Sequence, residues 1–281
     1  MTITESQIIY ILVLLATGIA VGFFCGLLGV GGGFLMVPVQ IWALSSQGIE
    51  STLATRIAFA TSLAVVLPTA ISGCKGHSCR GVVMWREGII IGLFGMLGGF
   101  FGGTIASHAP GELLRMLFGI LVILAAARML LVPHLQPGQE SDERPEKSIV
   151  QYMIWGLAVG VLSGLTGIGG GLMLVPIMIA ALGFSIYQAI GTSSVAISFN
   201  ALGGIIAYAI NGWGVEGLPR YCLGYIDLQQ FALLAASSIF SAQWGANAAH
   251  RLPAEQLKYI FIVLMLYIGA KMTGVLAWAG L

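Results

Sequence analysis

The stretch G-L-L-G-V-G-G-G-F-L-M-V-P, residues 26–38, returns later in the chain as G-L-T-G-I-G-G-G-L-M-L-V-P, residues 164–176. Three shorter matches follow in the same order: Ala60-Thr61-Ser62 with Gly191-Thr192-Ser193, residues 114–118 with 257–261, and residues 127–129 with 270–272. A thirteen-residue match with three more in order is a signature of internal duplication. The chain is therefore predicted to contain two copies of one structural repeat.

The composition requires an apolar solvent around the protein. Of the 281 residues, 58% are hydrophobic and 8% are charged, whereas soluble domains carry about 25% charged residues. So few charges cannot cover a water-facing surface, and a lipid bilayer is the solvent that accepts apolar side chains outside. The formal net charge of +1 gives no basic footprint for nucleic acid.

The apolar segments predict an all-α, polytopic transmembrane helical bundle. Eight segments have the length of about 20 residues that a bilayer requires, and two, 33–46 and 171–184, are shorter and follow the Gly-rich stretches. We expect about 8 spanning helices plus short discontinuous helices after Gly-rich breaks. The eight longer segments are 7–28, 52–73, 86–107, 111–133, 148–167, 186–211, 227–249 and 254–279. The polar linker 134–148 separates the first repeat, 1–133, from the second, 149–281.

Two topologies remain open at this point. If each short segment re-enters the membrane, each half has four passes and the halves are parallel. If each short segment crosses, each half has five passes and the halves are inverted, as in many secondary transporters. Segment lengths favour eight passes, and Lys75, Arg80 and Arg86 indicate a cytoplasmic loop between the third and fourth segments.

The Gly-rich motif predicts a broken helix inside the membrane. A nucleotide-binding fingerprint would need a strand before it and a soluble fold around it, and here both flanks are apolar helices. A short helix that starts inside the membrane points free N–H groups and a partial positive charge inward, which suits an anion. The alternative is that the glycines only allow close helix packing. Two copies favour a binding role for Gly31, Gly32, Gly33, Gly169, Gly170 and Gly171.

Polar residues in the next long segment of each half are further candidates for substrate binding. Thr61, Ser62, Thr192, Ser193 and Asn200 recur at corresponding positions or lie close to them, with Thr69 as the counterpart of Asn200. Hydroxyls in membrane helices often bond only to their own helix, but a mid-membrane amide is costly unless it is used. Arg56 either snorkels to the membrane surface or faces the pathway and attracts anions.

In combination, these motifs resemble the sulfite exporter family (TauE/SafE), membrane transporters of the 4-toluene sulfonate uptake permease type. The resemblance covers essentially the whole chain. It rests on 26–38, 164–176, Gly191-Thr192-Ser193, the basic stretch 77–85, Gly224-Tyr225-Ile226-Asp227 and 252–257. Ala60 departs from the family's Gly-Thr-Ser motif in the first half. The resemblance implies transport of sulfite, sulfonates or other sulfur-containing anions.

The predicted function is secondary transport of a small anion: sulfite or bisulfite, an organosulfonate or a related sulfur-containing anion. The alternative is an anion channel, with the same helix ends lining an open pore. No catalytic constellation is recognisable, so we expect no enzyme activity, no catalytic residues, no cofactor and no metal site. The expected partners are the anion, the lipid bilayer, a coupling ion (H+ or Na+) and a second copy in a homodimer, in the cell membrane.

Overall fold

The computed structural model describes residues 5–28, 31–79, 81–131, 148–248 and 254–275. The helices are α1 (Glu5–Leu28), α2 (Gly33–Ser46), α3 (Ser51–Ser78), α4 (Trp85–His108), α5 (Gly111–Leu131), α6 (Ile149–Thr166), α7 (Gly171–Ala180), α8 (Ile186–Asn211), α9 (Leu228–Ala248) and α10 (Ala254–Met272). A two-stranded antiparallel hairpin, β1 (Cys222–Leu223) and β2 (Ile226–Asp227), precedes α9. The predicted all-α helical bundle is confirmed.

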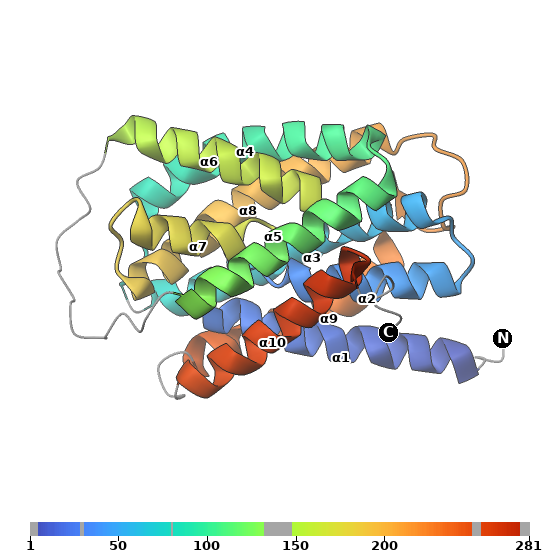
Figure 1. The fold of residues 1–281 in the computed structure, drawn as a ribbon, viewed down its shortest axis with the longest axis horizontal. Coiled ribbons are helices and arrows are strands. Elements are labelled where there is room, and N and C mark those ends of the chain that lie inside the picture. The colour runs from blue at the N-terminus through green and yellow to red at the C-terminus, as the bar shows by residue number, and fades with distance from the viewer. Residues whose placement is uncertain (1–4, 29–30, 80, 132–147, 249–253, 276–281) are drawn as a thin grey trace.

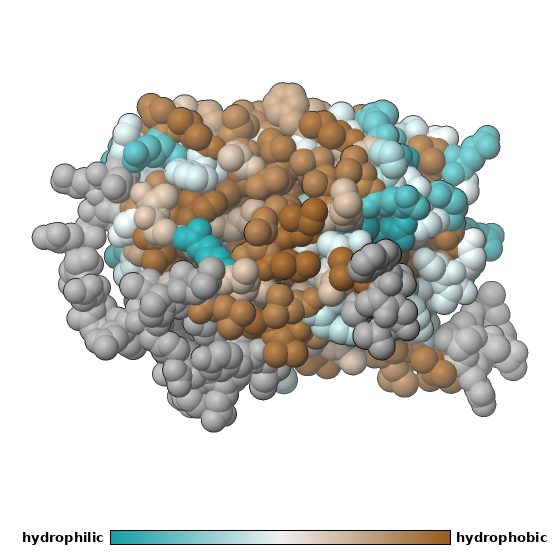
Figure 2. Space-filling view, viewed as in Figure 1, coloured by the Kyte–Doolittle hydropathy of each residue, from teal (hydrophilic) through white to brown (hydrophobic). Residues whose placement is uncertain are grey.

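Six of the helices in the described part of the chain are long and apolar enough to cross a membrane: α1, α3, α4, α5, α6 and α8. The other two expected spans correspond to α9 and α10, which do not belong to this set. α9 is 21 residues long but carries Gln229, Gln230 and Gln243 among its apolar residues. On the visible face, apolar side chains cover the middle of the bundle and polar ones gather toward its right end (Figure 2). These are the features of a multi-pass membrane protein.

The two helix breaks predicted from the Gly-rich motifs are present. α2 starts after Gly31 (φ 83°) and Gly32 (φ 70°), and α7 starts after Gly169 (φ 89°) and Gly170 (φ 86°). Side chains with a Cβ rarely adopt these left-handed conformations, whereas glycine does so at little cost. Each motif therefore ends one helix and starts a shorter one with the same pair of backbone conformations.

The helices of each half pack on those of the other half. α1 lies against α9, and its counterpart α6 lies against α4. At the middle of the bundle α3 packs on α8, and α5 packs on α10. A pair of repeats related by a twofold axis would give this exchange of partners. The duplication itself stays a prediction from the sequence.

The two halves enter the bundle from opposite ends. In Figure 1, α1 starts at the right end, α2 and α3 meet again at the right, and α5 ends at the left. α6 starts at the left, and α7 runs back to the left from the middle of the bundle. This is the inverted arrangement of the two topologies left open above, although α2 and α7 each run only from the middle to one end.

This arrangement predicts that the ends of α2 and α7 lie on opposite sides of the membrane. In a cysteine-free background, we expect Gln47→Cys and Ala181→Cys, at the exposed ends of α2 and α7, to react with a membrane-impermeant thiol reagent from opposite sides. Ala181→Cys should be labelled from the same side as a single cysteine restored at position 79, because α3 and α7 end at the same end of the bundle (Figure 1). Labelling of both positions from one side would contradict the inverted arrangement.

Candidate functional site

The two helix breaks meet at the centre of the bundle. A Cβ built on Gly31 would lie 3.6 Å from Val66 Cγ1 and 3.6 Å from Ile197 Cγ2. A Cβ on Gly169 would lie 2.8 Å and 3.6 Å from the same two atoms. One buried valine of α3 and one buried isoleucine of α8 thus pack against both breaks. The structure brings the two sets of predicted glycines together around an apolar centre.

Both short helices start without a side-chain cap. The N-cap residues are Gly32 for α2 and Gly170 for α7, and neither N-terminus has a side-chain cap hydrogen bond. In α7 the first backbone hydrogen bonds run from the N–H groups of Met173 and Leu174 to the Gly170 carbonyl, at 3.2 and 2.9 Å. Helix geometry leaves the N–H groups before them without an intrahelical acceptor. These donors are available to a bound anion.

The Ser62 hydroxyl stabilises the break in the other half of the chain. It donates to the Gly167 carbonyl at 2.8 Å, and it also lies 3.1 Å from the Phe59 carbonyl of its own helix. Gly167 has φ 68° and ends α6, so its carbonyl is released from the helix. Ser193, the counterpart of Ser62, donates to the Ile190 carbonyl at 2.9 Å. The one hydroxyl proton of Ser62 is thus already used within the protein.

The two predicted threonines hold the starts of later helices. The Thr61 hydroxyl accepts a hydrogen bond of 2.9 Å from the Asp227 N–H, directly before α9. The Thr192 hydroxyl accepts one of 2.9 Å from the Met84 N–H, directly before α4. Each threonine therefore links the central helix of one half to a helix of the other half.

Asn200 is the predicted site residue whose polar atoms have no partner. Its side chain is fully buried, and neither Nδ2 nor Oδ1 has a hydrogen bond. A Cβ on Gly170 would lie 3.0 Å from Asn200 Nδ2, so the amide faces the start of α7. An unsatisfied buried polar group costs about 1–3 kcal/mol. Such a group beside an uncapped helix N-terminus indicates a place for a ligand.

The structure places Arg56 at the corner between α4 and α5. One guanidinium nitrogen donates to the Ala109 carbonyl at 3.0 Å, and another lies 3.4 Å from the Tyr225 hydroxyl. The guanidinium also lies 6.0 Å from the centre of the Tyr225 ring, within reach of a cation–π interaction. Ala109 is the C-cap of α4, where a positive charge is favourable. These contacts tie Arg56 to α4 and not to the glycine breaks.

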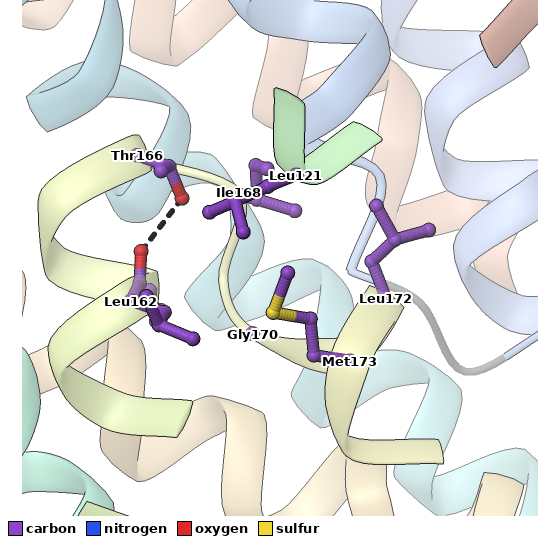
Figure 3. Close-up of a pocket in the computed structure, with 8 residues that line it drawn as sticks. Leu121, Leu162, Thr166, Ile168, Gly170, Leu172 and Met173 are labelled. Carbon is purple, nitrogen blue, oxygen red and sulfur yellow. Dashed lines mark hydrogen bonds between the residues drawn. The ribbon is translucent and has the colours of Figure 1, made fainter. Parts of the chain in front are cut away.

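Sequence reasoning missed Ser163, which lines a small pocket beside the second break. The pocket lies between α5, α6 and α7 and is lined by Leu121, Leu162, Ser163, Thr166, Ile168, Gly170, Leu172 and Met173. Figure 3 shows Ile168 and Met173 beside it, and the Thr166 hydroxyl bonded back to the Leu162 carbonyl. The Ser163 hydroxyl, in contrast, is buried without a hydrogen-bond partner. Its position one residue before the second motif was the available sequence signal.

Sequence reasoning also missed two equivalent hydrogen bonds to the first glycine of each motif. His77 Nε2 donates to the Gly26 carbonyl at 3.0 Å, and the Tyr208 hydroxyl donates to the Gly164 carbonyl at 2.9 Å. Both side chains are buried, and they come from corresponding places on α3 and α8. Different residue types perform the same task in the two halves, and for this reason the sequence match does not include them.

Among the residues that the structure describes, Asp227 is the buried carboxylate, and it lies at the end of the hairpin. Its Oδ1 accepts hydrogen bonds from the N–H groups of Gln229 at 2.9 Å and Gln230 at 3.1 Å. Burial raises the pKa of Asp227, while these two hydrogen bonds lower it. Burial also raises the pKa of the nearby Cys222 thiol to about 12, with a further contribution from the Asp227 charge. Asp227 thus caps α9.

Residues 14–272 match the family described as sulfite exporter TauE/SafE. A protein of Haemophilus influenzae named probable membrane transporter protein is 31% identical over 265 residues, covering 94% of this chain and 98% of the relative. A probable membrane transporter protein of Methanocaldococcus jannaschii is 27% identical over 92% of this chain and 94% of its own length. A relative from Xylella fastidiosa with the same printed name is 32% identical over 71% of this chain and 74% of its own length. No solved structure gives a significant match.

The Ser62 hydrogen bond predicts a specific loss of stability. Ser62→Ala removes the donor to the Gly167 carbonyl inside the bundle, so the free energy of unfolding should fall by about 1–3 kcal/mol. Ser198→Ala is the control, because the Ser198 hydroxyl bonds only to the Ser194 carbonyl of its own helix at 2.9 Å. Thermal unfolding of the detergent-purified variants measures both. Equal melting temperatures for the two variants would show that Ser62 does not stabilise the break.

Proposed function

Because the chain belongs to the sulfite exporter TauE/SafE family of membrane transporters, we propose that it is a secondary transporter of a small anion. Sulfite or bisulfite, an organosulfonate or a related sulfur-containing anion is the proposed substrate. H+ or Na+ is the proposed coupling ion. The observation that supports this most is the meeting of two broken helices at the centre of the bundle, with uncapped N-termini of α2 and α7.

The meeting point has the properties that an anion site needs. Partial positive charge at a helix N-terminus and free N–H donors stabilise negative charge. Neutral donors bind a dehydrated anion without the tight ion pair that would slow its release. The proposed shell is formed by the backbone at Gly31–Gly33 and Gly169–Gly171, with side chains from α3 and α8. The proposed side chains are Thr61, Ser62, Thr192, Ser193 and Asn200, of which Ser62 would act as an acceptor toward a protonated anion; Arg56 lies farther out.

A transporter is favoured over a channel by the packing between the two breaks. Val66 and Ile197 fill the space between Gly31 and Gly169, and both are almost completely buried, at 0% and 1% exposure. Apolar side chains of this kind close a pathway to water and ions. Passage then requires movement of one half against the other, as in alternating access.

The charges of the proposed site favour a monoanion over a dianion. A helix end contributes about half a positive charge, and the Arg56 guanidinium contacts the end of α4 instead of the breaks. The cost of dehydrating an ion rises with the square of its charge, so a dianion pays roughly four times the cost of a monoanion of equal size. Two helix ends and neutral donors compensate one negative charge more readily than two.

A competition panel on protein reconstituted in liposomes tests this proposal. Bisulfite and a small sulfonate should compete for uptake better than sulfate, and the apparent affinity for total sulfite should improve as the pH falls and bisulfite replaces sulfite. Saturable uptake that a second ion gradient can drive uphill is expected for a secondary transporter. Equal affinity for sulfate and a monoanionic sulfonate, without pH dependence for sulfite, would refute the electrostatic argument.

The apolar centre leads to a second prediction about transport. Val66→Ala combined with Ile197→Ala removes the side chains between the breaks, so anions should leak down their gradient without saturation. Val195→Ala is the control, since Val195 is a buried residue of α8 that packs with Cys74 and Val83 instead. Flux assays on matched liposomes measure the leak. Saturable flux without leak in the double variant would show that these side chains do not close the pathway.

A further inference from the structure

We propose that, within this central site, the transported anion lies at the start of α7, where Ser163 and Asn200 join the backbone N–H groups of the second break as its ligands. This inference rests on the proposed transport function and adds where within the site the anion lies. Ser163 is a ligand that neither the motifs nor the family resemblance indicated. The first half, by this account, completes the site from the opposite side with the start of α2 and offers the weaker side-chain contacts.

Ser163 and Asn200 converge on the N-cap residue of α7. A Cβ built on Gly170 would lie 3.0 Å from Asn200 Nδ2 and 3.3 Å from Ser163 Cβ. The two side chains come from different helices, α6 and α8, and are 1% and 0% exposed. Ser163 is also one of the residues that line the small pocket beside the second break.

The Ser163 hydroxyl and the Asn200 amide have no hydrogen-bond partner in the protein. The N–H groups at the start of α7 precede the first intrahelical bonds to the Gly170 carbonyl. A buried hydroxyl and a buried amide without partners are unfavourable on their own. One oxyanion could accept from the Ser163 hydroxyl, from Asn200 Nδ2 and from the backbone together, and would thereby satisfy these donors.

In the first half, the side chain that corresponds to Asn200 already has hydrogen-bond partners within the protein. Thr69, the counterpart of Asn200, donates to the Val65 carbonyl at 2.7 Å and shares a 2.7 Å hydrogen bond with the Ser238 hydroxyl. Cys25 stands where the second motif has Ser163, and a thiol is a weak hydrogen-bond donor. The first half therefore offers fewer and weaker side-chain donors to an anion than the second.

The helices that pack beside Asn200 and Thr69 differ in the same way. α4 has a glycine next to Asn200, and α9 has a serine next to Thr69. A Cβ on Gly95 of α4 would collide with Asn200 Oδ1, so glycine at this position accommodates the amide. In the other half, α9 has Ser238 as the neighbour of Thr69. The glycine makes room for a side chain that has no protein partner, whereas the serine provides a partner. This difference directs the ligand to the second half.

Matched variants in the two halves test the proposal by isothermal titration of the purified full-length protein with bisulfite at mildly acidic pH. Ser163→Ala should weaken the bisulfite Kd about tenfold through the loss of one hydrogen bond to a charged ligand. Asn200→Leu, which keeps a similar side-chain size, should also weaken it about tenfold, because it removes the amide N–H donor. The first-half controls Cys25→Ala and Thr69→Val should stay within about twofold of the wild-type Kd.

The outcomes separate this inference from the proposed function. The proposed site is wrong if bisulfite binds the wild-type protein and the second-half variants equally well, or if substitutions in both halves weaken binding alike. In either case the chain can still be a transporter. If the wild-type protein neither binds nor transports bisulfite, the proposed function fails and this inference fails with it. Ser163→Cys, which introduces the first-half residue with little change in volume, should also weaken binding if Ser163→Ala does not fold.

Discussion

Inside a bilayer, every backbone N–H and C=O group needs a partner from the protein, and the two broken helices of this chain depend on that constraint. Continuous helices satisfy their own backbone, but a helix that ends at the centre of the membrane releases carbonyls and N–H groups into an apolar region. The left-handed conformations of Gly31, Gly32, Gly169 and Gly170 make the breaks sterically possible. They do not by themselves satisfy the groups that the breaks release.

The rest of the fold supplies those partners, in part from one half to the other. Ser62 of the first half donates to the Gly167 carbonyl of the second, and Thr61 and Thr192 accept from N–H groups that precede α9 and α4. His77 and Tyr208 hold the first glycine of each motif in its own half. The Gly26, Gly164 and Gly167 carbonyls are thus bonded to side chains, while the N-termini of α2 and α7 have no side-chain cap. This difference between bonded carbonyls and uncapped N–H groups is the basis of our proposal that the centre binds an anion.

The sequence predicted the features that depend on local chemistry and repetition, and it missed those that depend on contacts between distant segments. The all-α class and both breaks followed from apolar length and from glycine, and both are present. The bonds of Ser62, Thr61 and Thr192 join residues more than 100 positions apart, so no local pattern encodes them. Ser163 was not predicted because the first half has cysteine at the corresponding position, so the match between the halves does not include it. In the part of the chain that the structure describes, six of the eight expected spans are long and apolar enough to cross a membrane. α9 is not among them because its polar residues reduce its hydropathy.

An experimental structure with a selenium analogue of bisulfite tests the central claim most directly. Hydrogen selenite is a monoanion of similar shape, and its selenium atom can be located by anomalous diffraction from crystals grown in its presence. The account predicts a selenium peak between the two halves, within hydrogen-bond reach of the start of α7 and the Asn200 amide. A peak near Arg56 at the corner of α4 and α5, or on the outside of the bundle with the centre unoccupied, would contradict it.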